Sequence, residues 1–190
     1  MQNPVYFNDF KTNMRSFLVT SRFNNATHNE NKTYIKNHKK LSCIYCCPLI
    51  MTTQIPIDSV VFVLEMNNDK NKIMGIGMIK NHPVMNKYHV YKNNNYNRYV
   101  YAGKNYISRE SMTPQEELIM KALDILCFKG NTHMKRGQGL QLFPLKILYK
   151  CLKVVNILKF IQNMFIPVKI SEQGEIYTTN KIKTNRPTIK

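Results

Sequence analysis

Two apolar runs separated by a turn sequence occupy the centre of the chain. Residues 59–65 form a continuous apolar run, as in a strand that is buried on both faces. Residues 67–71 are rich in turn-forming types, and residues 72–79 follow as a second strand with Gly75 and Gly77 in its interior. Glycine weakens a strand, so this pair predicts a bulge, a tight bend or the close approach of another backbone.

Further short segments favour strands on either side of these two. Residues 16–20 predict an edge strand or a strand that leads into the sheet, and residues 87–91, 99–101 and 105–108 predict three more. Residues 24–40 are polar and basic, and they fit either a loose helix or an extended loop. The first part of the chain is therefore expected to be mostly β.

The pattern becomes helical after residue 112. Thr113, Pro114 and Glu116 supply an N-cap, a first-turn proline and the second half of a capping box. Together with Gly130 as a stop signal, they predict a helix near residues 113–129. A second helix is predicted over residues 144–163.

Strands followed by helices indicate an α+β fold. We expect a small, strongly bent, barrel-like sheet over about residues 16–108, packed by the two C-terminal helices. Residues 1–170 would form a single domain and residues 171–190 a basic, flexible tail.

The chain carries 28 lysines and arginines against 11 aspartates and glutamates, which gives a formal net charge of +17. Such an excess repels itself in a folded chain unless an anionic partner neutralises it. Nucleic acid is the commonest such partner, because each neutralised phosphate releases counterions. We expect non-enzymatic nucleic-acid binding that prefers RNA or single strands, through a basic face on which tyrosines stack with bases.

Three segments supply the candidate nucleic-acid contacts. The first is a polar and aromatic cluster near residue 23, the second interleaves tyrosines with cations over residues 88–106, and the third is a glycine-rich loop at residues 130–139. This loop precedes the expected helix start near Pro144, where amides and cations favour a phosphate. The candidates are Arg22, Asn24, Asn25, Tyr96, Arg98, Lys104, Lys135 and Arg136.

Cys43 and Cys46 have the spacing of a zinc knuckle, in which one tight turn presents two thiolates to the metal. A structural zinc needs two more ligands, for which Cys127 and His133 are the leading candidates. His28, His38 and Cys47 are the rival ligands. The alternative is that these cysteines are small apolar core residues without a metal.

Two other functions fit the composition. One is a virion protein that neutralises a packaged genome or an acidic partner protein, and the other is a nuclease or base-processing enzyme that uses His133 or Cys46. No apolar run approaches the ~20 residues that cross a bilayer, and residues 1–10 lack a signal-peptide pattern. We therefore expect an intracellular protein with no membrane partner, in the host cytoplasm or the virion if the chain is viral.

Residues 55–64, Ile-Pro-Ile-Asp-Ser-Val-Val-Phe-Val-Leu, and residues 73–79, Ile-Met-Gly-Ile-Gly-Met-Ile, resemble the PUA-like superfamily. There, a proline and an acidic residue lead an apolar strand into a strand with alternating glycines as a barrel curls. The superfamily includes ASCH, EVE and YTH modules, so the resemblance implies binding of RNA or modified bases. The chain has no Trp, so the tryptophan cage of a YTH module is not implied. The abundance of Asn, Lys and Ile is similar to that in proteins of large A/T-rich DNA viruses.

Overall fold

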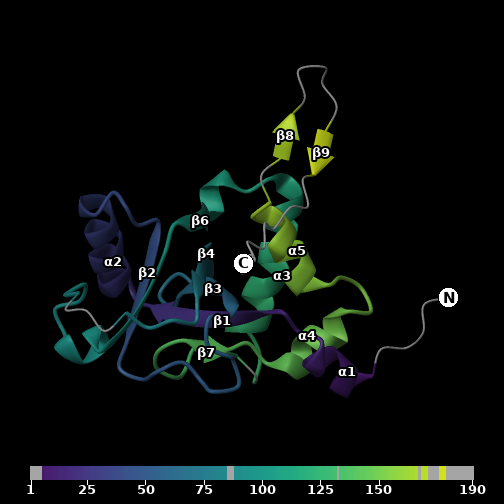
Figure 1. The fold of residues 1–190 in the computed structure, drawn as a ribbon, viewed down its shortest axis with the longest axis horizontal. Helices are drawn as coiled ribbons and strands as arrows, with labels where there is room; N and C mark the ends of the chain where they lie inside the picture. Colours follow the sequence, from purple (N-terminus) through teal and green to yellow (C-terminus); the bar gives the residue numbers. More distant parts are fainter. Residues whose placement is uncertain (1–5, 85–87, 132, 167, 171–175, 179–190) are drawn as a thin grey trace, which may run out of the picture.

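The computed structural model describes residues 6–84, 88–131, 133–166, 168–170 and 176–178. Its centre is a five-stranded mixed sheet in the order β6-β4-β3-β1-β7 (Figure 1). The strands are β1 (Ser16–Phe23), β3 (Val60–Asn67), β4 (Lys72–Lys80), β6 (Asn105–Ser108) and β7 (Gln141–Leu142). β1 and β3 are parallel, and every other pairing in this sheet is antiparallel.

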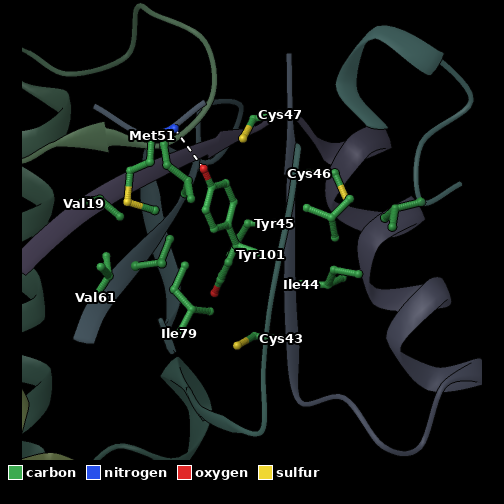
Figure 2. Close-up of a cluster of buried hydrophobic side chains, with 14 of the residues drawn as sticks. Val19, Cys43, Ile44, Tyr45, Cys46, Cys47, Met51, Val61, Ile79 and Tyr101 are labelled. Atoms are coloured by element: carbon green, nitrogen blue, oxygen red, sulfur yellow. Dashed lines mark hydrogen bonds between the residues drawn. The ribbon is translucent and has the colours of Figure 1, made fainter. Parts of the chain in front are cut away.

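A second sheet pairs β2 (Cys43–Cys47) with β5 (Tyr99–Gly103) in antiparallel register and packs over one face of the main sheet. Val19, Val61 and Ile79 of the main sheet meet Tyr45 and Tyr101 of the small sheet in this layer. Figure 2 shows these side chains together, with the Tyr101 hydroxyl accepting a hydrogen bond from the Met51 backbone N–H at 2.9 Å. The two sheets therefore enclose one apolar core.

The helices divide between the two faces of the main sheet (Figure 1). α2 (Asn25–Asn37) lies beside the small sheet, whereas α3, α4 and α5 pack on the other face around Leu18, Phe62 and Leu64. The remaining bounds are α1 (Phe7–Thr12), α3 (Pro114–Phe128), α4 (Leu145–Cys151), α5 (Ile157–Met164), η1 (Asn94–Asn97) and η2 (Arg109–Ser111). No helix in these described ranges is long and apolar enough to cross a membrane.

The α+β prediction is confirmed. Within the described residues the main sheet runs from β6 to β7 without closing into a barrel, so the barrel-like part stays a prediction. β1 is not at an edge, because β3 and β7 flank it on its two sides. Residues 88–91 contain no strand, whereas residues 43–47 form β2 in place of the expected turn.

Helix α3 has the predicted capping box, in which Thr113 and Glu116 each bond the other's backbone N–H. The helix predicted over residues 144–163 is two helices, because the Asn156 side chain accepts from the Lys159 backbone N–H and begins α5. Within residues 24–40, Asn25–Asn37 form helix α2, with Asn24 as its N-cap.

The predicted basic tail, with Lys181, Lys183, Arg186 and Lys190, falls mainly outside the described residues. Within its expected span, β9 (Ile176–Thr178) pairs with β8 (Val168–Ile170) in a short antiparallel ladder. The single-domain boundary at residue 170 stays a prediction.

Candidate nucleic-acid interface and its pocket

Five of the eight candidate nucleic-acid residues come together where β1 and β3 end. The Asn25 backbone N–H donates to Asp69 Oδ2 at 2.8 Å, which joins the start of α2 to the turn between β3 and β4. Asn68 Nδ2 in that turn donates to the Lys135 carbonyl at 3.0 Å, which adds the loop after α3. We call the side chains of Asn24, Asn25, Lys70, Lys135 and Arg136 the basic patch; Lys135 is half-buried and the others are exposed.

Arg22 lies in this region, but its guanidinium forms hydrogen bonds within the protein. Its guanidinium donates to the Met134 carbonyl at 2.8 Å, to the Gly139 carbonyl at 3.2 Å and to Thr20 Oγ1 at 2.9 Å. Burial lowers the pKa of Arg22 from its ordinary value. Gly139 adopts a φ of 68°, which favours glycine, as the loop turns back toward β1. Arg22 therefore positions the loop that carries Lys135 and Arg136.

Asn24 also has a structural role, because its Oδ1 caps α2 by accepting from the Thr27 backbone N–H at 2.8 Å. Tyr96, Arg98 and Lys104 lie apart from the basic patch, around β5. Arg98 and Lys104 are exposed just outside the two ends of this strand. The sequence interpretation therefore joined two surfaces that the fold separates.

The tyrosines of residues 88–106 do not form an exposed stacking face. Tyr91 and Tyr101 are buried, and Tyr88, Tyr96, Tyr99 and Tyr106 are half-buried. The Tyr96 ring packs edge-on against Tyr91, with ring centroids 6.2 Å apart. Stacking on these strand tyrosines is therefore not supported, because the two sheets use them as core.

The structure reveals a buried carboxylate that the sequence interpretation missed. Glu65 in β3 is 0% exposed, although an unpaired buried charge is costly. Its Oε1 accepts from the Tyr45 hydroxyl at 2.9 Å, and its Oε2 accepts from the Tyr106 hydroxyl at 2.9 Å and from Lys32 Nζ at 3.0 Å. Burial and the Glu65 charge raise the pKa values of both tyrosines, which keeps them protonated as donors.

Gly75 and Gly77 make room for these two tyrosines. A Cβ at Gly75 would overlap the Tyr106 hydroxyl, and a Cβ at Gly77 would overlap the Tyr45 hydroxyl. The register of β3 with β4 shifts between Leu64 and Met66, so a bulge lies at Glu65 itself. The expected bulge is present, and the close approach at Gly75 comes from both the Tyr106 ring and the Ile107 backbone carbonyl, whereas at Gly77 it comes from side chains.

Helix α2 supplies the basic groups that face Glu65. Lys32 reaches it with a side chain that is still 34% exposed, and Nζ also lies 4.0 Å from the Tyr106 ring centroid. His28 Nε2 lies 3.9 Å from Glu65 Oε2 and is buried without a hydrogen-bond partner. Burial is the main cause of the lowered pKa of His28.

A pocket of about 410 Å³ opens beside Lys32. We call it the Lys32 pocket; its lining residues are His28, Lys32, Lys72, Met74, Tyr106, Ser108, Arg109, Glu110 and Glu117. Arg109 bonds Glu117 and Asp124 and thereby fastens α3 beside the pocket. When Glu65 beneath the pocket is included, the site has three basic side chains (Lys32, Lys72 and Arg109) and three acidic ones (Glu65, Glu110 and Glu117). The site is therefore close to neutral, although the chain has a net charge of +17.

A larger hollow of about 520 Å³ lies along β7, with Leu49 and Ile50 on its rim, each more than half exposed. Lys146 is the one charged side chain among the residues that line it. The Lys32 pocket is the better candidate site, because buried charge and an unpartnered imidazole converge there.

The structure does not bring the four expected zinc ligands together. Cys43 and Cys46 point to opposite sides of β2 (Figure 2), because side chains three apart on a strand lie on opposite faces. Cys127 packs in the core on the far side of the main sheet, and His133 follows α3. No group of three or more His, Cys, Asp or Glu side chains positioned for a metal occurs in the described part of the chain. The four residues therefore do not converge in this arrangement, and zinc binding stays a prediction.

The rival ligands and the suggested nucleophile also have other roles. His38 stacks on Tyr34 with ring centroids 3.9 Å apart, and Cys47 Sγ lies 3.6 Å from the Tyr99 carbonyl. Burial raises the pKa of Cys47 to about 11 and that of Cys46 further, which disfavours the reactive thiolate. These thiols behave as core residues.

The phosphate site expected ahead of Pro144 is not formed as predicted. β7 lies between the glycine-rich loop and α4, and it pairs with β1. The loop amides and the helix start are therefore separate features. The Lys135 carbonyl instead bonds Asn68 in the turn between β3 and β4.

Comparisons with known proteins do not assign this arrangement to a family. No protein-family model matches the chain, and neither the curated proteins nor the solved structures include a match.

Proposed function

We propose that this chain is a non-enzymatic nucleic-acid-binding protein that prefers single strands, RNA in particular. The basic patch contacts phosphates, and the adjacent Lys32 pocket receives one unstacked base. The observation that supports this proposal is that most positively charged side chains of the described residues have no acidic partner within the protein. Of the lysines and arginines in the described ranges, Lys32 and Arg109 alone form ion pairs.

Several acidic side chains of the described residues, in contrast, already have partners within the protein. Glu65 is buried, Glu117 and Asp124 hold Arg109, and Asp69 holds the start of α2. Glu116 completes the cap of α3. The charge left for a partner is therefore mostly positive, and a polyanion is the partner that relieves the repulsion.

The Lys32 pocket supports the preference for single strands. The pocket has basic side chains that donate hydrogen bonds and acidic side chains that accept them, in nearly equal number. This balance suits an uncharged base with both amino and carbonyl groups better than a phosphate. The pocket and the basic patch share the first turn of α2, because Asn25 of the basic patch begins this helix and His28 in the pocket wall follows it three residues later. A base reaches such a pocket only when it is unstacked, as in single strands and loops.

The PUA-like resemblance belongs to the same proposal. A barrel-like sheet that binds RNA agrees with a pocket that β4 helps to line through Lys72 and Met74, and it adds the expectation of base recognition. The basic tail of residues 171–190 would add phosphate contacts.

Charge-removing variants test the role of the basic patch. Fluorescence anisotropy with a labelled 12-nucleotide RNA would compare Lys135→Ala/Arg136→Ala with Lys150→Ala/Lys153→Ala, which removes two exposed cations from α4 and the turn after it. We expect the patch variant to reduce the slope of log Kd against log salt by roughly 0.7 for each phosphate that the protein no longer neutralises. An equal weakening of binding by both double variants would show that net charge, and not the basic patch, governs binding.

A further inference from the structure

His28 and Lys32 compete for one buried carboxylate. Both project from α2, one helical turn apart, toward Glu65 Oε2. Lys32 holds the close position at 3.0 Å, and His28 Nε2 stays at 3.9 Å without a partner. Glu65 is completely buried and needs a counter-ion, but either of the two side chains is able to supply it.

The two competitors differ in their access to the pocket. The Lys32 side chain is 34% exposed and has a flexible stem, so its ammonium group is able to turn from Glu65 toward a bound strand. The His28 side chain is 13% exposed and is held edge-on against Phe23, with ring centroids 5.7 Å apart. His28 is therefore the counter-ion that remains with Glu65 when Lys32 leaves.

We propose that the Lys32 pocket binds a nucleic-acid strand together with one proton, which His28 takes up as Lys32 turns from Glu65 to the strand. This inference rests on the proposed function and names its regulation. The proton goes from solvent to His28 Nε2 and no covalent bond to the strand forms or breaks. Linkage then requires that the strand raises the proton affinity of His28 by the same factor as the proton raises the affinity for the strand.

Several charged or titratable groups act on His28 or line the same pocket. They are Lys32 on α2, Glu65 on β3, Lys70 in the turn between β3 and β4, Lys72 on β4, Tyr106 on β6, Arg109 and Glu110 on η2, and Glu117 on α3. In the free protein, burial and the two nearby lysines hold the pKa of His28 below its ordinary value, so the imidazole is neutral at pH 7. Binding should therefore tighten as the pH falls toward the pKa of His28 in the free protein and level off below it.

The first experiment measures the Kd of the labelled 12-nucleotide RNA between pH 7.5 and pH 5.5. We expect the affinity of the wild type to rise on the order of tenfold, within the usual range of such coupling, and His28→Gln to lose most of this rise. His82→Gln is the matched control, because His82 is exposed and pairs with Asp58 away from the pocket. An equal pH response in His28→Gln and the wild type would overturn the proposal.

The second experiment needs no nucleic acid, so it separates this inference from the proposed function. NMR titration of the histidine ring signals would follow the pKa of His28 in Lys32→Met and in Lys36→Met, one turn further along α2. Because Glu65 loses its lysine only in Lys32→Met, we expect a clear upward shift there and little change in Lys36→Met. The same pKa in both variants would show that the two side chains do not exchange. RNA binding that is absent at every pH would instead refute the proposed function.

Discussion

Glu65 shows how one residue shapes its surroundings over three strands. It ends the apolar run of residues 59–65. In the fold, hydroxyls from β2 and β6 and the ammonium group of Lys32 surround it. These hydrogen bonds offset the cost of burying its charge. Their geometry depends on tyrosine rings that lie directly over glycines of β4.

Gly77→Ala tests this packing. A methyl group at this position would overlap the Tyr45 hydroxyl and crowd Cys43 Sγ, so we expect the free energy of unfolding to fall by about 1–3 kcal/mol. Urea unfolding followed by circular dichroism measures the loss. Gly77→Ala/Tyr45→Phe, which removes the nearest clashing atom, should cost less than the sum of its single variants. An Ala variant as stable as the wild type would show that Tyr45 is not fixed over β4.

At the scale of elements, α2 is the main gap in the sequence prediction. Its residues are mostly polar and its apolar anchors are few, so hydrophobic periodicity does not distinguish a helix from a loop. The signal that defines it is local: Asn24 and Thr27 form a reciprocal capping box. α2 matters for function, because it carries both His28 and Lys32.

Asn24 variants distinguish capping from ligand contact. Asn24→Ala removes the acceptor for the Thr27 N–H, and we expect it to lower the free energy of unfolding by about 1 kcal/mol. Asn24→Asp keeps an acceptor and should retain most of the stability. Thermal unfolding of the two variants provides the measurement. A stable Asn24→Ala variant with weakened RNA binding would return Asn24 to the direct-contact role inferred from sequence.

Four strands of the main sheet (β1, β3, β4 and β6) and α3 were predictable, since apolar runs, turn residues and a capping box are local signals. The two-residue strand β7 was not predicted. Cys43 and Cys46 were misinterpreted because the spacing of two thiols is the same in a knuckle and in a strand, and only the pairing of β2 with β5 decides between them. The Glu65 cluster joins residues 32, 45, 65 and 106, so no local pattern reveals it. The structural role of Arg22 was not visible in the sequence, because its carbonyl partners lie more than a hundred residues away.

For the molecule as a whole, acidic and basic side chains have different roles in the fold. Most acidic side chains described above hold caps, turns or Arg109, whereas most lysines and arginines of the described residues have no acidic partner. The Lys32 pocket is an exception, with acidic and basic groups in near balance beside the basic patch. This contrast is the physical basis for assigning phosphate contacts to the basic patch and base contact to the Lys32 pocket.

The most direct test of this account compares a single-stranded 12-nucleotide RNA with its duplex at one salt concentration, in the wild type and in Lys32→Met. We expect the wild type to bind the single strand about tenfold or more tightly than the duplex, a difference of roughly 1.4 kcal/mol. Lys32→Met should lose much of this preference and keep its duplex affinity, with Lys36→Met as the control of equal charge. Equal wild-type affinity for both forms would contradict the account and favour a virion protein that neutralises a packaged genome.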